Sequence, residues 1–117
     1  MRTPLIAGNW KMNKTHLEAI HFLEQLGHEL ADHDPKKVEV VLCPPHTALR
    51  SVQTTIDDRH QAFGLGAQNM HHENEGAFTG EVSPVMLKSL HVGYVILGHS
   101  ERREMFGESN ETVNQKV

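Results

Sequence analysis

Four short apolar runs alternate with segments of helical periodicity, and this alternation limits the fold more than any other feature of the sequence. The runs are residues 5–8, 38–43, 60–68 and 93–97. Such short runs with branched residues predict strands, and the last one, with Val95 and Ile96, reads as buried on both faces. Because strands and helices alternate with short connections, we expect right-handed crossovers and a parallel sheet.

Helix-start signals lie between and after the runs. Thr15 and Glu18 fit a capping box, and the apolar spacing that follows predicts an amphipathic helix. Thr47 is expected to cap a second helix, and Ser83, followed by proline, a third. Residues 108–113, with acidic side chains suited to a helix N-terminus, predict one more helix.

Four strand–helix units fit either a small doubly wound domain or part of a (β/α)8 barrel. Because the sequence ends inside a predicted helix, without a helix-ending signal, we expect the barrel. Barrels of this kind run to roughly 250 residues. Residues 1–117 are therefore expected to supply about the first four βα units, the N-terminal half of one domain.

Composition narrows the possible functions. A formal net charge of -4 with dispersed Lys and Arg argues against nucleic-acid binding. No apolar stretch approaches the ~18 residues of a membrane helix and no secretory signal is present, so we expect no membrane partner and a cytoplasmic location. Cys43 is the only cysteine, which excludes an internal disulfide, and it is expected to be buried.

The ten histidines suggest no metal site. The neighbours His71 and His72 lie near Glu73 and Glu75, but adjacent side chains diverge on a strand or loop, so no metal ligation is expected. Six others are scattered among polar residues, and most of them are expected at the surface: His16, His21, His28, His33, His46 and His60.

Polar residues directly follow the first and fourth strands. Asn9 and Lys11, two residues apart, would point the same way and suit an anionic, oxygen-rich ligand; alternatively, Lys11 is a solvated loop lysine. His99 follows the fourth strand, where loops converge and the next helix directs its free N–H groups. That field disfavours imidazolium, so a neutral ring could donate to a substrate carbonyl; alternatively, His99 only satisfies backbone groups.

Three segments carry a specific family resemblance. They are AGNWKMN at residues 7–13, GAFTGE at 76–81 and YVILGHSERR at 94–103. In order and spacing they closely resemble the triosephosphate isomerase family, whose fold is the TIM (β/α)8 barrel. The long polar loop over residues 69–80, a length typical of functional loops, contains the second segment.

The resemblance implies a reaction and its residues. Enzymes of this family interconvert dihydroxyacetone phosphate and D-glyceraldehyde 3-phosphate, a step of glycolysis and gluconeogenesis, by enediolate proton transfer without a metal or cofactor. Asn9 and Lys11 match the substrate-binding pair, with Lys11 facing the phosphate and the developing oxyanion. His99 matches the neutral electrophile, Glu101 the carboxylate that orients Lys11, and Ser100 the neighbour beneath the histidine.

The resemblance also implies partners. Thr79 matches the loop-tip residue that reaches a neighbouring subunit's active site, so a homodimer is expected, with Phe78 and Met12 at its interface. The family's general base, lid loop and phosphate cradle match nothing in residues 1–117. We therefore expect these residues to be inactive alone and to require a complementary C-terminal half.

Two alternatives give the chain no catalysis of its own. It could be a half-barrel assembly or phosphate-binding module, since unpaired sheet edges favour self-association. Alternatively, two copies could close into an eight-stranded ring that still lacks a base.

Overall fold

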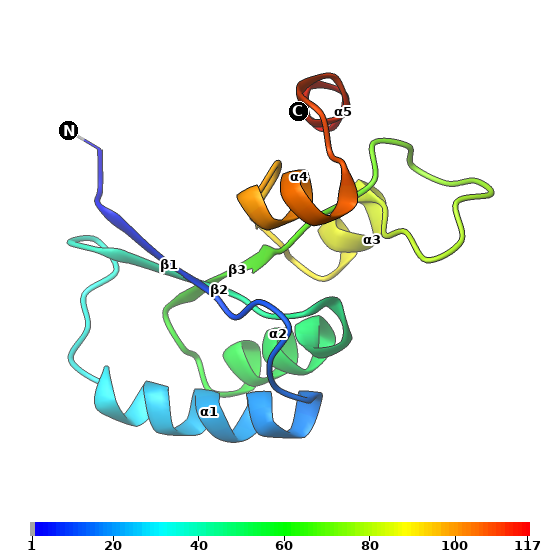
Figure 1. The fold of residues 1–117 in the computed structure, drawn as a ribbon. Helices are drawn as coiled ribbons and strands as arrows, with labels where there is room; N and C mark the ends of the chain where they lie inside the picture. Colours follow the sequence, from blue (N-terminus) through cyan, green and yellow to red (C-terminus); the bar gives the residue numbers. More distant parts are fainter. Residues whose placement is uncertain (1) are drawn as a thin grey trace.

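A computed structural model describes residues 2–117 (Figure 1). Four parallel strands form one sheet in the order β1-β2-β3-β4, which confirms the predicted alternation and the first units of a TIM barrel. In chain order the elements are β1 (Leu5–Asn9), α1 (His16–Glu29), β2 (Glu39–Cys43), the 3-10 helix η1 (His46–Ala48), α2 (Leu49–Asp58), β3 (Phe63–Ala67), α3 (Pro84–Ser89), β4 (Tyr94–Val95), α4 (Ser100–Phe106) and α5 (Asn110–Lys116).

Local capping signals predicted the starts of α1 and α3 correctly. At α1 the Thr15 hydroxyl accepts the Glu18 N–H at 3.2 Å, and the Glu18 carboxylate accepts the Thr15 N–H at 3.1 Å, a complete capping box. Ser83 caps α3 in the same manner, since its Oγ accepts the Met86 N–H at 3.2 Å.

The predicted cap at Thr47 is wrong. After Pro45 the backbone turns at once, and the Ala48 N–H donates to the Pro45 carbonyl at 2.9 Å to form η1. Thr47 therefore lies inside this turn, and Ala48 precedes α2 without a side-chain cap.

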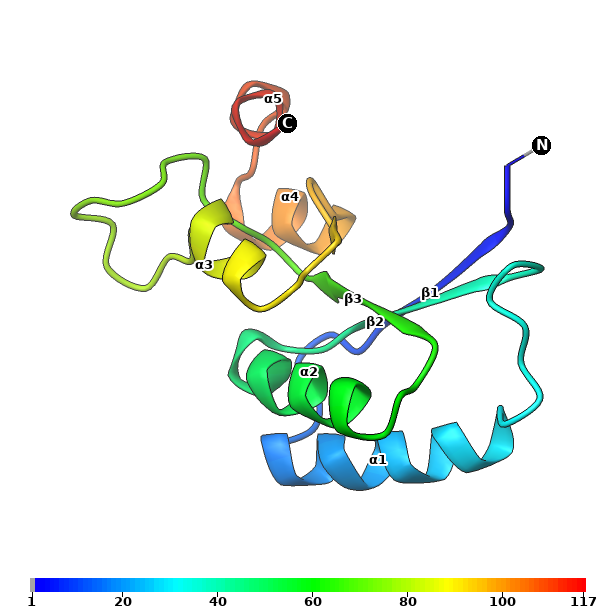
Figure 2. The same ribbon diagram turned by 180° about the vertical axis from the view of Figure 1, so that it is seen from behind.

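The core lies between the sheet and the helices that cover one of its faces. Helices α1 and α2 lie side by side on that face (Figure 1, Figure 2). Leu23 of α1 and Leu49 and Val52 of α2 are completely buried against strand residues such as Leu42 and Leu65. Cys43 is buried as predicted, and burial raises the pKa of its thiol.

Burial on both faces fails at the outer strands. Burial on both faces was predicted most directly for the fourth strand, but its Tyr94 is exposed, and in β1 Ile6 is 62% exposed. These two strands are the edges of the sheet, and among residues 2–117 helices cover only one face of β1. The third and fourth strands are also shorter than predicted; β4 ends at Val95, and Gly98 then turns the backbone with φ +61°.

The predicted long loop between β3 and α3 projects from the rest of the chain (Figure 1, Figure 2). Its base is closed by the His71 N–H, which donates to the Val82 carbonyl at 2.8 Å. Inside the loop the His71 ring stacks on Phe78, with ring centroids 4.1 Å apart. The loop therefore has a defined conformation without regular secondary structure.

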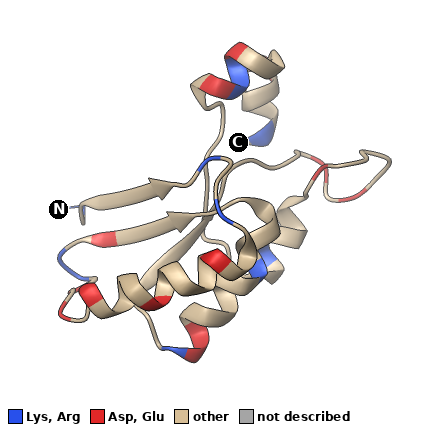
Figure 3. Cartoon of the chain, turned by 60° about the horizontal axis from the view of Figure 1, so that its bottom comes forward, with Lys and Arg blue, Asp and Glu red and all other residues tan. Residues whose placement is uncertain are grey.

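Charged residues of both signs are spread over helices and loops (Figure 3). Within the described residues, no helix has the length and apolar character needed to span a bilayer.

Candidate functional site

The carboxyl end of the sheet carries a cleft of about 600 Å³. This volume lies within the range of roughly 300–1,000 Å³ that is common for small-molecule sites. The four predicted substrate-binding and catalytic residues line it together: Asn9 at the end of β1, Lys11 just after it, and His99 and Glu101 after β4. Strands at opposite edges of the sheet thus bring their terminal side chains to one place, as expected for parallel strands.

Lys11 has an unusual backbone. Its φ is +56°, a left-handed conformation that costs a residue with a side chain roughly 1–2 kcal/mol. The Asn9 side-chain oxygen accepts the Lys11 N–H at 2.9 Å. The Lys11 ammonium in turn donates to the carboxylate of Glu101.

Glu101 lies in the first turn of α4, where the helix N-terminus favours a negative charge. The hydrogen bond from Lys11 lowers the pKa of this carboxyl below its ordinary value, so Glu101 is a carboxylate at neutral pH. Both side chains are partly exposed, so the pair adds little to stability. The pair places the Lys11 ammonium against the first turn of α4.

His99 is the N-cap of α4 as well as a wall of the cleft. Its Nδ1 accepts the Glu101 N–H at 3.1 Å, which requires a lone pair on that nitrogen. The ring proton is therefore on Nε2, which becomes a hydrogen-bond donor. The two interpretations of His99 from the sequence are thus compatible, since one nitrogen satisfies the backbone and the other is free to donate.

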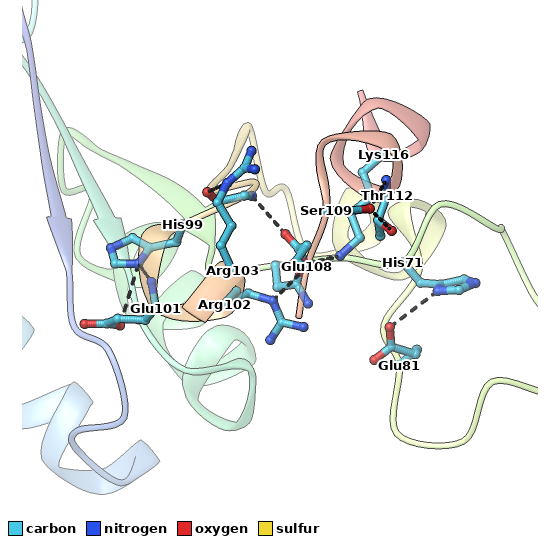
Figure 4. A network of polar contacts seen from close by, with 12 residues as sticks. His71, Glu81, His99, Glu101, Arg102, Arg103, Glu108, Ser109, Thr112 and Lys116 are labelled. Carbon is cyan, nitrogen blue, oxygen red and sulfur yellow. Dashed lines mark hydrogen bonds and ion pairs between the residues drawn. The ribbon is translucent and has the colours of Figure 1, made fainter. Parts of the chain in front are cut away.

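A buried ion cluster holds the turn before His99 (Figure 4). The Glu108 carboxylate accepts the Gly98 N–H at 3.1 Å, Arg102 Nε at 3.0 Å and Lys116 Nζ at 3.0 Å. Burial raises the pKa of Glu108, but the hydrogen bonds from Lys116 and Arg102 outweigh it, and the net shift is downward. Lys116 also donates to the Asn69 side chain at 2.8 Å, so α5 is tied to the end of β3.

Sequence reasoning missed this cluster and the helix α4. Glu108 was assigned only to the start of the last helix, because its side-chain partners lie on two separate helices, Arg102 on α4 and Lys116 on α5. The block of charges after His99 hid a short helix that ends at Gly107, whose φ of +65° is typical of a helix C-terminus.

Four of the six scattered histidines are exposed, which confirms that most of them lie at the surface, but His46 and His33 are half-buried. His46 lines the cleft, its Nε2 lies 3.1 Å from the Asn69 carbonyl oxygen, and burial lowers its pKa. The Pro44-Pro45 pair gave a signal for this, since it ends β2 and places residue 46 at the carboxyl edge of the sheet.

The remaining predicted residues lie around the cleft in different ways. Met12 lines it and is 95% exposed. Ser100, the first residue of α4, is exposed and does not line it. Phe78 and Thr79 lie in the projecting loop, outside the lining, and both are exposed. Among residues 2–117, no three His, Cys, Asp or Glu side chains are grouped to hold a metal ion.

Four parallel βα units with a cleft at the carboxyl edge of the strands define part of a (β/α)8-barrel protein. Residues 4–117 match the family model described as triosephosphate isomerase. The chain belongs to the triosephosphate isomerase family.

Curated relatives agree over the whole chain. It is 56% identical to the triosephosphate isomerase of Carboxydothermus hydrogenoformans, covering 100% of this chain and 45% of that protein. It is 54% identical to the protein of the same name from Trichodesmium erythraeum, covering 100% and 47%, and 51% identical to that of Alkaliphilus metalliredigens, covering 100% and 45%. The chain thus spans about half the length of the curated relatives it matches.

Proposed function

We propose that residues 1–117 form the N-terminal half of a single barrel domain that interconverts dihydroxyacetone phosphate and D-glyceraldehyde 3-phosphate in the cytoplasm. The observation that supports this most directly is the cleft that gathers Asn9, Lys11, His99 and Glu101 at the carboxyl edge of the sheet. A chain of this family with these groups at one cleft suits a small, anionic, oxygen-rich substrate.

In this proposal the residues divide the work of stabilising an enediolate. His99 donates from Nε2 to the substrate carbonyl oxygen, and Lys11 places its positive charge beside the phosphate and the developing oxyanion. Glu101 holds the Lys11 ammonium in position, while Asn9 fixes the Lys11 backbone and has its amide N–H groups available for the substrate. Donors placed where negative charge develops lower the barrier most effectively.

The proton itself must be removed by a base within hydrogen-bond reach of the carbon acid. Glu101 is unsuited to that task because it is engaged by Lys11 and is held as a poorly basic carboxylate. We therefore assign the base, the lid loop and the phosphate cradle to a complementary C-terminal half. The proposed reaction moves protons only and needs no cofactor.

The projecting loop supports a homodimer. It presents Phe78, 43% exposed, next to Thr79, and Met12 beside the cleft is almost fully exposed. We assign the contact with the second subunit to this loop. In the proposal, Thr79 reaches the active site of the second copy.

A hybrid protein tests the proposed function. It joins residues 1–117 to the part of the Carboxydothermus hydrogenoformans relative that lies beyond the matched region. We expect the hybrid to isomerise triose phosphate in a coupled assay, and residues 1–117 alone to show no turnover.

Lysine variants of the hybrid locate the activity. Lys11→Met should remove most of it, because it deletes the cation in the cleft. Lys14→Met is the matched control, since Lys14 lies in the same loop but stands over the Phe22 ring, outside the lining. A folded hybrid without turnover, or equal activity in the two variants, would contradict the proposal.

A further inference from the structure

The direction of the Lys11 side chain depends on its backbone as well as on the ion pair with Glu101. The Lys11 side chain is 53% exposed, so neighbouring atoms leave it considerable freedom. Its left-handed φ of +56° is uncommon for a lysine and persists only where surrounding groups hold it. The Asn9 side chain holds the N–H of Lys11, which leaves the carbonyl to be fixed by another group.

Gln68 supplies that second contact. It directly follows β3, and its Nε2 donates to the Lys11 carbonyl at 2.9 Å and to the Cys43 carbonyl at 2.9 Å. One side-chain amide thus joins the loop after β1 to the end of β2. With Asn9, it holds both polar groups of the Lys11 backbone.

We propose that Gln68 is a positioning residue that acts through Lys11, aiming the ammonium into the cleft for an anionic oxygen of the substrate. This inference rests on the proposed function. Without the amide donor, no other group within residues 2–117 holds the Lys11 carbonyl, and the backbone relaxes toward an ordinary negative φ. Rotation at that residue swings the side chain away from Glu101 and from the cleft.

The test is a double-mutant cycle in the hybrid protein. Gln68→Met keeps the length and approximate volume of the side chain but removes the donor, and it is made with Lys11 present and in the Lys11→Met background. Gln53→Met is the matched control, because Gln53 is also a hydrogen-bonded glutamine but does not line the cleft. Circular dichroism checks folding, and kcat/KM is the readout.

We expect Gln68→Met to lower kcat/KM by about 10- to 100-fold, the loss that a small misplacement of a catalytic group produces. In the Lys11→Met background, Gln68→Met should change kcat/KM less than twofold. Gln53→Met should change kcat/KM less than twofold in either background. Wild-type kcat/KM in Gln68→Met, or an equal fold-loss in both backgrounds, would overturn the inference.

Two further outcomes are distinguishable. If Gln68→Met does not fold, Gln68→Glu provides a second variant that keeps the shape and replaces the donor with oxygen; failure of both to fold makes Gln68 a structural residue and overturns its positioning role. If Lys11→Met itself leaves kcat/KM unchanged, the proposed function fails, and the inference with it.

Discussion

The Glu108 cluster gives the sharpest stability prediction, for the substitution Glu108→Gln in the hybrid protein. The side chains of Glu108 and Lys116 are each only 4% exposed, so the substitution leaves a buried ammonium without its counter-charge. Removing one partner of a buried ion pair costs about 3–5 kcal/mol. Gly98 and Arg102 lose part of their hydrogen bonding as well, which favours the upper half of that range.

Urea unfolding followed by circular dichroism measures this free energy. The matched control is Glu104→Gln, because Glu104 is exposed on α4, and we expect its free energy of unfolding to stay within about 0.5 kcal/mol of wild type. The double variant with Lys116→Met should recover part of the loss, since no unpaired charge remains. Equal stabilities of Glu108→Gln and Glu104→Gln would refute the reasoning.

The difference in the free energy of unfolding between wild type and Glu108→Gln should depend on pH. The pKa of Glu108 is lower in the folded protein than in the unfolded chain, so its contribution is fully present above the unfolded value of about 4.3. It is lost as the pH falls through the folded pKa. The difference between wild type and Glu108→Gln should therefore be full at pH 7 and shrink in acid, whereas a difference that grows toward acid would show that the cluster is not charged as described.

Three further predictions concern the fold. Thr15→Ala should lower the free energy of unfolding of the hybrid by about 1 kcal/mol through loss of the α1 cap, and an unchanged value would exclude that role. Gly98→Ala should lower the free energy of unfolding more than Gly107→Ala. Both glycines have positive φ, but a Cβ at residue 98 would lie 2.8 Å from a Val113 methyl, while one at residue 107 meets nothing within 4 Å. Equal losses in urea unfolding would contradict this difference in packing. Residues 1–117 alone should self-associate through the uncovered sheet. Light scattering should therefore fall more with Ile6→Lys than with Leu17→Lys, a similarly exposed position on α1. Equal effects of the two substitutions would show that the sheet is not the surface that associates.

The sequence predicted features that depend on neighbouring residues. The capping box at Thr15 and the alternation of strands and helices are encoded within a few positions, and the structure confirms them. The sequence also predicted that Asn9, Lys11 and His99 lie near one another, because parallel strands bring their carboxyl ends to one edge of the sheet. Their individual roles came only from the family resemblance.

Features that depend on how separate elements fold against one another could not be predicted. Glu108 meets Lys116 and Gly98 only after α4 and α5 fold back on the end of β4, and no spacing in the sequence encodes that approach. The contact of Gln68 with the Lys11 carbonyl joins residues 57 positions apart. The exposed face of β1 was not predicted for a different reason. An apolar run predicts burial whether or not another element is present to cover it.

The two ring nitrogens of His99 have different roles, one at the start of α4 and one in the cleft, and this affects how its variants must be interpreted. Substitution by alanine or glutamine would weaken the start of α4 and remove the donor in the cleft at once, so any kinetic loss would mix helix fraying with lost chemistry. Asparagine is a favourable residue at a helix start. His99→Asn would therefore keep α4 anchored while removing the Nε2 donor, and it isolates the contribution of the imidazole to the reaction.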